Sequence, residues 1–292
     1  MTYRKKRYGD RWDGRRIRSL SPMIRITSYI MPDRKGATNY IRDSVEVSAV
    51  ERYIRKKRMQ GQKGFGIMHF FTATYVRIVS QKPGLNRYIT NRELYARDNI
   101  TVAMVIKKEM KLDAQETIVK LEYSPYSTAN DVYEALNREI AENREEGDNN
   151  SIDDTARILN FIPRPILRGV IAFLRFLDNY NKMPRFLLKL SPFHVSCFFT
   201  SMGSLGIPPV FHHLYEFGNC PMFISYGPKR TEYQLMPDGS TQRRTFIDFT
   251  FTTDERICDG HYMASTLKSM HDIFRHPEIL DEPPESIVGD VD

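Results

Sequence analysis

Apolar residues at every second position from 245 to 251 predict a strand with one buried face. Residues spaced as on one side of a helix follow it: Leu267, Met270, His271 and Phe274. They predict an amphipathic helix that ends near Pro277. A charged turn, residues 252–261, joins the two elements, and Gly260 gives the turn backbone freedom. The end of the chain is therefore predicted to fold as strand, turn and helix.

Further strands and helices are predicted along the rest of the chain. Apolar or alternating runs predict strands at 40–47, 99–106, 195–200 and 221–226. Helical spacing predicts helices at 67–78 and 127–142, the second with cap residues at its start. Pro237-Asp238-Gly239 predicts a hairpin turn that leads into strand 245–251. The glycine-rich stretch 61–66 lacks the pattern of a phosphate-binding loop, and no internal repeat is present.

One long apolar stretch differs in character from the rest of the chain. It begins at Ile158, ends at Leu190, and follows a very polar run. On a helix, Arg164, Arg168 and Arg175 fall within about 40° of one another and form a cationic stripe. We expect a helical hairpin that is buried or faces another subunit. The alternatives are a lid over an apolar substrate pocket and a helix that lies on a membrane surface.

Composition and charge describe a globular chain with two charged ends. Of its 292 residues, 41% are hydrophobic and 27% are charged, and the net charge is +7. Residues 1–14 form a basic arm, and residues 281–292 form an acidic tail. A basic end can bind nucleic acid, anionic lipid or an acidic protein. Because no ordered basic and aromatic recognition module accompanies the arm, we expect no nucleic-acid partner.

The three cysteines exclude two classes of site. Cys197, Cys220 and Cys258 are odd in number and widely spaced, which fits neither a disulfide framework nor a zinc site. We therefore expect no metal. The first residues lack the apolar core of a signal peptide, and no stretch reaches the ~18 apolar residues of a membrane span, so the expected location is cytoplasmic.

The turn at 252–261 is the richest candidate for chemistry. Asp254, Glu255, Arg256 and Asp259 crowd it, directly before Gly260. Spacing alone leaves two interpretations open. The turn is either a connector whose arginine pairs with its own carboxylates, or a catalytic turn that presents an acid or a base.

Three blocks of the chain resemble the catalytic domain of the dihydrolipoyl acyltransferases of 2-oxoacid dehydrogenase complexes, relatives of chloramphenicol acetyltransferase. Residues 254–260 resemble the family's Asp-His-Arg-x-x-Asp-Gly motif. Residues 199–206 resemble its Thr-Ile-Ser-Asn-Leu-Gly-x-Phe-Gly segment, and residues 82–86 resemble the end of its Phe-Pro-Glu-Leu-Asn helix. The order of the blocks agrees over residues 15–280. The exception is an insertion at about 145–190, which includes the apolar stretch.

The resemblance implies an α/β fold of the α+β type, a two-layer sandwich like chloramphenicol acetyltransferase, with a helical insertion. It also implies a homotrimer or a multiple of three, with active sites between neighbouring subunits. The implied donor is acyl-coenzyme A, or an acyl group on a lipoyl-bearing partner protein. Since the short basic arm cannot hold a lipoyl domain, we expect no covalently bound lipoyl group on this chain.

The resemblance also assigns roles to individual residues. It implies that Thr200, next to Ser201, donates a hydrogen bond to the oxyanion. It implies that Asp259 is a structural carboxylate and that Arg256 is its partner. The position of the catalytic histidine is occupied by Glu255. A thiol has a pKa near 8.5 and a glutamate one near 4.3, so this base would meet a proton-transfer cost of roughly 6 kcal/mol.

Two functions remain open at this point. In the first, the protein is an acyltransferase that uses acyl-coenzyme A, with Glu255 or a histidine of the pair His212 and His213 as base. A glutamate base suits an amine or alcohol acceptor better than a thiol. In the second, the protein is a catalytically inactive oligomeric scaffold that binds partners or a membrane through its basic arm and apolar insertion.

Overall fold

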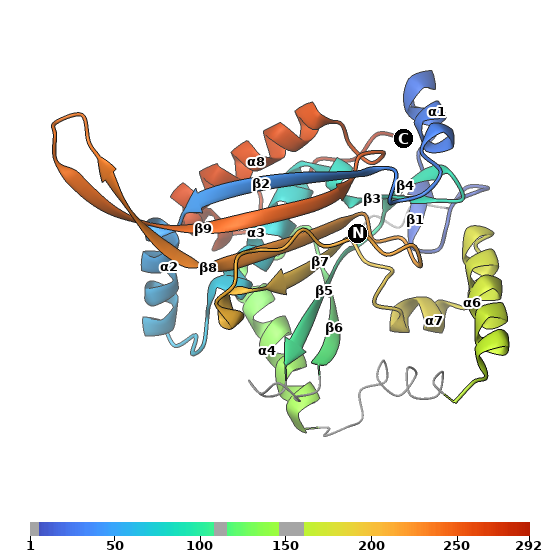
Figure 1. Ribbon diagram of the computed structural model, residues 1–292, viewed down its shortest axis with the longest axis horizontal. Helices are drawn as coiled ribbons and strands as arrows, with labels where there is room; N and C mark the ends of the chain where they lie inside the picture. The colour runs from blue at the N-terminus through green and yellow to red at the C-terminus, as the bar shows by residue number, and fades with distance from the viewer. Residues whose placement is uncertain (1–5, 108–115, 146–160) are drawn as a thin grey trace.

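A six-stranded mixed sheet forms the centre of the computed structural model, which describes residues 6–107, 116–145 and 161–292 (Figure 1). From one edge to the other, the strands are β2 (Thr38–Glu46), β9 (Thr241–Asp254), β8 (Met222–Leu235), β7 (Cys197–Ser201), β5 (Ile100–Lys107) and β6 (Glu116–Tyr123). Strand β7 runs parallel to both of its neighbours, and the other pairs are antiparallel. The strands predicted at 40–47, 99–106, 195–200, 221–226 and 245–251 are confirmed.

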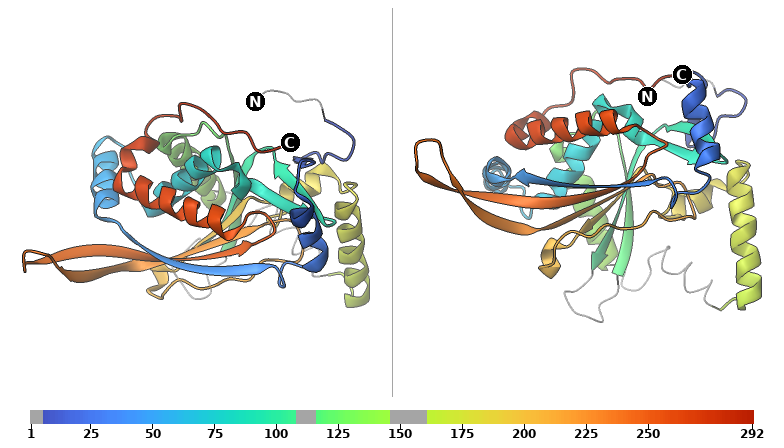
Figure 2. Two further views of the ribbon diagram at one scale, coloured as in Figure 1. Left: turned by 90° about the horizontal axis from the view of Figure 1, so that it is seen from above. Right: turned by 45° about the horizontal axis from the view of Figure 1, so that its top comes forward.

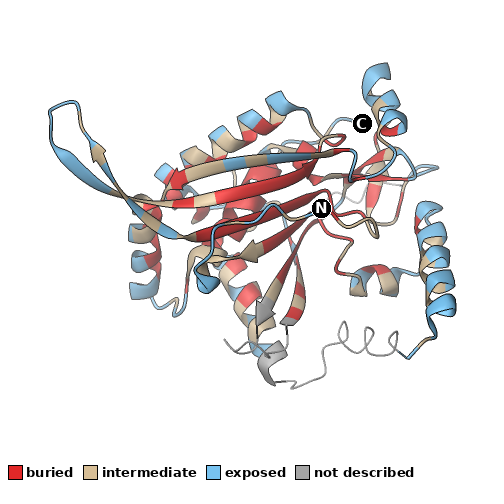
Figure 3. Cartoon of the chain, in the orientation of Figure 1, coloured by how far each residue is buried: buried red, intermediate tan, exposed pale blue. Residues whose placement is uncertain are grey.

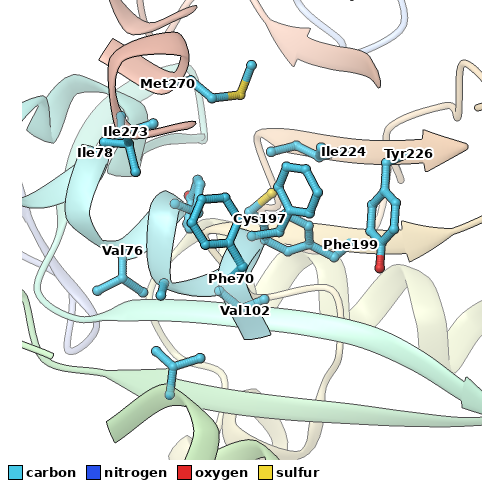
Figure 4. Packing of buried hydrophobic residues seen from close by; sticks show 14 of the residues in the cluster. Phe70, Val76, Ile78, Val102, Cys197, Phe199, Ile224, Tyr226, Met270 and Ile273 are labelled. Carbon is cyan, nitrogen blue, oxygen red and sulfur yellow. The ribbon is translucent and has the colours of Figure 1, made fainter. Parts of the chain in front are cut away.

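Helices cover one face of this sheet, as the two views in Figure 2 show. They are α2 (Ser48–Met59), α3 (Ile67–Gln81), α4 (Ala129–Glu145) and α8 (Gly260–Arg275). The main core lies between the two layers, where Phe71 of α3 packs 4.4 Å from Phe249 and 5.0 Å from Tyr226, measured between ring centroids. Figure 4 shows part of this core, with Phe199 and Ile224 from the sheet and Phe70 from α3. The chain is therefore a two-layer α/β sandwich, as expected.

A second, smaller sheet lies at one end of the sandwich, and several short helical segments connect the longer elements. The strands, in order, are β1 (Gly14–Arg16), β4 (Glu93–Arg97) and β3 (Arg87–Thr90). The short helices are α1 (Pro22–Ile30), η1 (Pro83–Asn86), η2 (Gly203–Leu205) and η3 (Pro277–Leu280). The sequence did not predict the β3–β4 hairpin, because its turn residues Asn91 and Arg92 adopt φ values of 49° and 63° without the glycine that usually marks such a turn.

The distal halves of β8 and β9 project beyond the body as a hairpin (Figure 1). The turn predicted at 237–239 lies at its tip. Tyr233 and Leu235 on this hairpin are 72% and 77% exposed. A projecting hairpin with exposed large side chains is a surface that another protein chain can cover.

The apolar stretch forms α6 (Arg164–Asn179) and α7 (Arg185–Leu190), at one side of the body. The first part of the predicted stretch, residues 158–160, lies outside the described residues. Within one chain α6 is not buried: its best-covered stripe, from Leu167 to Leu177, is only half-buried, and Phe173 is 59% exposed (Figure 3). In the described part of the chain, no helix is long and apolar enough to cross a lipid bilayer.

A cluster of buried charges ties α6 to the body. We call it the buried ion cluster, and it consists of Arg11, Asp13, Arg97, Asp178 and His194. The Arg11 guanidinium lies 2.6 Å from a carboxylate oxygen of Asp178 on α6 and 3.2 Å from one of Asp13. His194 Nε2 lies 3.1 Å from the other Asp178 oxygen. The only acidic side chain of α6 is therefore used inside the protein, and its arginines face outward.

The acidic tail lies along the body, and the basic arm contacts it. Asp290 pairs with Arg87 at 2.5 Å, and Arg7 of the arm pairs with Asp292 at 2.9 Å. Arg15 donates to the backbone carbonyls of Asp290 and Val291. Part of the arm's positive charge is therefore neutralised within the same chain.

Candidate active site

The predicted catalytic turn follows the end of β9. Asp254 is 1% exposed and forms two hydrogen bonds with the Arg256 guanidinium, of 2.8 and 2.6 Å. Arg256 also donates to the carbonyl of Met31 at 2.8 Å. The implied pairing of Arg256 with Asp259 is therefore wrong. The Asp259 side chain is instead the N-cap of α8 and accepts a hydrogen bond of 2.7 Å from the Tyr262 amide.

The Glu255 backbone is held by a hydrogen bond, whereas its side-chain carboxylate has no partner among the described residues. Its amide donates to the Ala37 carbonyl at 2.9 Å, and the side chain is half-buried. Within the described residues, the Glu255 carboxylate forms no hydrogen bond or ion pair. Gly260 has an ordinary helical backbone, and an added Cβ would meet nothing within 4 Å. The expectation that the turn needs glycine there for its backbone freedom is therefore wrong.

Thr200 lies on the sheet face opposite the helices, which we call the outer face. Its neighbour Phe199 packs into the main core, whereas Phe198 belongs to a separate cluster on the other side. Since side chains alternate along a strand, Thr200 shares the outer face with Phe198. It lies directly opposite Ser225 of β8. Ser201 points to the helical side and forms a hydrogen bond with Tyr226. The Thr200 hydroxyl has no such partner among the described residues.

Residues 207–217, which we call the crossing segment, run over the outer face. The Val210 amide donates to the Ser225 hydroxyl at 3.2 Å, and the Thr250 hydroxyl donates to the Val210 carbonyl at 2.6 Å. At the segment's end, Gly218 has a φ of +85°, and an added Cβ would lie 2.4 Å from the Phe193 carbonyl oxygen. Only glycine fits there. The segment is thus fixed at both ends beside the strand that carries Thr200.

His212 lies in the middle of the crossing segment and is held in one orientation. Its ring stacks on Phe223 of β8, with 3.9 Å between the ring centroids and 6° between the planes. Nδ1 lies 2.8 Å from the His213 carbonyl oxygen. Because a carbonyl oxygen only accepts, this contact assigns the proton to Nδ1 and leaves Nε2 with a free lone pair. Burial lowers the pKa of His212, so the ring is neutral at pH 7.

His213 differs from its neighbour in its surroundings. Its ring is exposed and stacks on the His212 ring with 4.4 Å between centroids. Two adjacent candidates in the sequence therefore separate into one held ring and one exposed ring. The feature that distinguishes them is the aromatic ring of Phe223 beneath His212, and the path of the crossing segment over β8 places it there.

Strand register gives the distances between the candidate residues. Phe223, on which His212 stacks, lies opposite Phe198. Since Phe198 is two residues before Thr200, the Phe223 and Thr200 backbones are roughly 8 Å apart. Thr200 pairs with Ser225 of β8, and Ser225 pairs with Thr250 of β9. Thr250 is four residues before Asp254, so the Thr200 and Asp254 backbones are roughly 16 Å apart. Within one chain the register therefore keeps Thr200 apart from Glu255, whereas His212 packs over Phe223 on the outer face that Thr200 shares. A site with both Thr200 and Glu255 requires a second copy.

Two further histidines, His194 and His261, are not free bases on this face. His194 belongs to the buried ion cluster, and both of its ring nitrogens are engaged, with Asp178 and with the Ser191 hydroxyl. His261 is exposed in the first turn of α8. Among the residues that the structure describes, no three His, Cys, Asp or Glu side chains come close enough to hold a metal ion. A void below α8 has about 30 Å³, roughly one water molecule, and is too small for a substrate.

Comparison with solved structures identifies the fold. The structure resembles a probable dihydrolipoamide acetyltransferase from Listeria monocytogenes 4b F2365, with a TM-score of 0.56 and 10% identity over 89% of this chain and 94% of that one. It resembles a chloramphenicol acetyltransferase equally, with a TM-score of 0.56 and 12% identity over 89% and 99% of the two chains. It also resembles a truncated catalytic core of the 2-oxoacid dehydrogenase multienzyme complex from Thermoplasma acidophilum. The TM-score is 0.54 and the identity 12%, over 89% of this chain and 98% of that one.

Sequence comparison adds no closer relative. No protein-family model matches the chain, and no curated protein matches it. The likeness to solved structures therefore defines the fold, at an identity of 10–12%. The chain has the fold of the chloramphenicol acetyltransferase-like acyltransferases, as the sequence motifs implied.

Proposed function

We propose that this protein is an acyltransferase that moves an acyl group from acyl-coenzyme A to a small nucleophilic acceptor, with His212 as base and Thr200 as oxyanion donor. The observation that carries the proposal is the His212 ring, neutral, fixed by its Nδ1 proton and free at Nε2, on the same outer face as the uncommitted Thr200 hydroxyl. A donor carried on the lipoyl group of a partner protein would fit the same chemistry.

The reaction follows from these two groups. His212 Nε2 removes the proton of the acceptor as the acceptor attacks the thioester carbonyl. The Thr200 hydroxyl donates a hydrogen bond to the oxygen that becomes negative. When the tetrahedral intermediate collapses, the carbon–sulfur bond breaks, and the imidazolium returns its proton to the leaving thiolate. An imidazole base is closer in pKa to a thiol than a carboxylate is, so a thiol acceptor is accessible as well as an amine or alcohol.

We propose that the working form is a homotrimer or a multiple of three. The register separates Glu255 from Thr200 by more than a side chain can span, so Glu255 reaches the Thr200 site only from a second copy. Its uncommitted carboxylate would then orient the acceptor or the protonated ring of His212. The projecting hairpin, with Tyr233 and Leu235 exposed, offers surface for contact between copies.

The alternative is a catalytically inactive scaffold of the same fold. The departure from the family motif at Glu255 motivates it, because a carboxylate is a poor base for a thiol. The two proposals differ in one property, the release of coenzyme A. An inactive scaffold would assemble and bind its partners without consuming acyl-coenzyme A in the presence of any acceptor.

The first test removes the oxyanion donor. In an assay of coenzyme A release from acetyl-coenzyme A with a panel of amines, alcohols and thiols, T200V should lose about 10²–10³-fold in kcat/KM. The matched control T200S keeps the hydroxyl and should stay within about threefold of wild type. A wild-type chain that releases no coenzyme A with any acceptor would favour the scaffold. A T200V variant as active as T200S would remove Thr200 from the mechanism.

A second proposal concerns α6, which we propose lies on an anionic membrane surface. Its exposed side combines Ile166 and Phe173, 58% and 59% exposed, with the outward arginines Arg164, Arg168 and Arg175. Because Asp178 forms a buried ion pair with Arg11, the exposed side of the helix carries only positive charge. An amphipathic helix with a wide apolar side and a cationic stripe suits an interface with acidic lipid headgroups.

Vesicle flotation tests the membrane proposal. The wild-type chain should float with vesicles that contain acidic phospholipid and not with neutral vesicles. The double variant R168Q/R175Q should lose most of this binding, since each basic residue near the surface contributes about 1 kcal/mol. As a control, R243Q on the projecting hairpin should bind as wild type does. Equal flotation of R168Q/R175Q and R243Q, or none by wild type, would contradict the proposal.

A further inference from the structure

A second cavity lies on the outer face, near the β6 edge of the sheet and apart from His212. Its volume is about 310 Å³, large enough for a small ligand. Side chains from several elements line it, and those used below are Trp12, Asp13, Arg97, Lys120, Leu188 and His194. Lys120 is separated from Thr200 by two strand spacings and two residues, roughly 12 Å. The cavity is therefore distinct from the proposed acyltransferase site.

Lys120 is a half-buried lysine whose amine is held in place. Its neighbours Val119 and Leu121 pack into the main core, so the Lys120 side chain points to the outer face. The amine lies 2.9 Å from the Leu188 carbonyl oxygen and 2.9 Å from that of Ser191. These carbonyls lie on α7 and directly after it.

Two hydrogen bonds hold the Lys120 nitrogen and leave one position on it free. A neutral –NH₂ group has two N–H donors and one lone pair, whereas an ammonium has three donors. With both donors bound to Leu188 and Ser191, the lone pair is left free on an amine that lines the cavity. In the described part of the structure, no acceptor receives a third hydrogen. The two carbonyls therefore hold the nitrogen at the wall of the cavity, where the uncharged form has its lone pair free.

The charges that face Lys120 act in both directions. Burial is the main cause that lowers its pKa, and Arg97 of β4 lowers it further. Asp13, before β1, and Glu122, on β6 itself, oppose this, and the result is a pKa of about 7. His194 before β7 is engaged with Asp178 and Ser191. At pH 7 about half of the Lys120 amines are uncharged, roughly 10³ times the fraction of an ordinary lysine.

We propose that Lys120 is an acyl-accepting lysine that is modified by an acyl thioester bound in this cavity. The amine lone pair attacks the thioester carbonyl, the carbon–nitrogen bond forms, and the carbon–sulfur bond breaks. The proton that the amine loses goes to the leaving thiolate, so the products are an amide on Lys120 and a free thiol. Leu188 and Trp12 give the cavity apolar surface for a short acyl chain. The modification removes the charge of Lys120 and its hold on α7.

The experiment uses the full chain with acetyl-coenzyme A as probe, and mass spectrometry of peptides to follow each lysine. Lys120 should be acetylated at least tenfold faster than Lys189, an exposed lysine on the rim of the same cavity. Its rate should rise tenfold per pH unit below pH 7 and level off above about pH 8, because the amine is then fully uncharged. Equal rates at Lys120 and Lys189, or a Lys120 rate that keeps rising to pH 9, would overturn the proposal.

The variants T200V and H212Q separate this proposal from the acyltransferase proposal. Acetylation of Lys120 needs neither residue, so both variants should modify Lys120 at the wild-type rate even where they release no coenzyme A to an added acceptor. Loss of Lys120 acetylation in both variants would instead show that the Thr200 site transfers the acetyl group to Lys120. That result would contradict a separate reactive lysine and leave the acyltransferase proposal standing.

Discussion

The variant H212Q is expected to release coenzyme A about 10²–10⁴-fold more slowly than wild type, since it loses the general base. Glutamine keeps a planar polar group above Phe223 but offers no nitrogen lone pair. Two contacts hold the proposed base: the stacking on Phe223 and the hydrogen bond from Nδ1 to the His213 carbonyl. Burial keeps its ring neutral. Steady-state kcat/KM with the acceptor found active for wild type measures the effect.

The pH dependence of wild-type activity tests the role of His212 as base in a second way. His212 works as a base only when it is uncharged, so activity should fall as pH drops through its pKa. Burial lowers that pKa below the ordinary value of about 6.5. The kcat/KM profile should therefore be flat with respect to this group from about pH 7 upward and fall tenfold per unit below its lowered pKa.

H213Q is the matched control for H212Q. Its ring is exposed and lies on the solvent side of His212, so we expect a loss of about threefold or less. An H212Q variant that keeps wild-type turnover would contradict the assignment. If E255Q abolished turnover in the same assay, the role of base would pass to Glu255 from a second copy.

The largest expected effect on stability comes from Arg11. Replacing it with methionine should lower the free energy of unfolding by about 3–5 kcal/mol, the usual cost of removing one partner from a buried ion pair. Arg11 is 1% exposed and lies between Asp13 and Asp178, so R11M removes the cation that these two buried carboxylates share and leaves Asp13 paired with Arg97 and Asp178 with His194. Because Asp178 belongs to α6, the helix should lose its attachment to the body. Urea unfolding followed by circular dichroism measures the change.

R175M is the matched control, since Arg175 is exposed on the same helix that Arg11 holds. It should change the unfolding free energy by no more than about 0.5 kcal/mol. Equal stabilities of R11M and R175M would show that the buried ion cluster contributes little.

The same cluster predicts how stability depends on pH. Burial is the largest single influence on the pKa of Asp178 and raises it, but His194 and Arg11 together outweigh burial and lower the pKa to about 2. The folded value lies below the unfolded value of about 3.9, so this contribution is present above pH 4 and is lost as pH falls toward 2. It amounts to about 2 kcal/mol. In D178N the unfolding free energy should therefore change less between pH 4 and pH 2 than it does in wild type.

Much of the fold could be predicted because its strands carry a strong local signal. The residues of β9 alternate because one face packs under helices, and the strands β5 and β7 are short apolar runs because both faces are covered. The hairpin β3–β4 was missed because Asn91 and Arg92 adopt the turn without a glycine. The burial of Arg11 in the basic arm was missed for a different reason: its partner Asp178 is distant in the sequence.

The candidate site shows the same division between local and distant information. The motif identified Asp254 and Arg256, but their mutual pairing depends on side-chain direction rather than on spacing. The sequence offered His212 and His213 as equivalents, and only the Phe223 ring from another strand separates them. Lys120 gave no signal at all, because its surroundings come from α7, β4 and the loop before β1. Functional groups that depend on pairing across the sheet are invisible to local patterns.

The central claim is that Thr200 and His212 act at one site. The most direct test is the coenzyme A release rate of the double variant T200V/H212Q, compared with each single variant in the same assay. Residues that act as a unit lose less together than the product of their separate losses. We expect the double variant to be no more than about tenfold slower than the slower single variant. Losses that multiply fully would show that the two residues act independently and contradict the account.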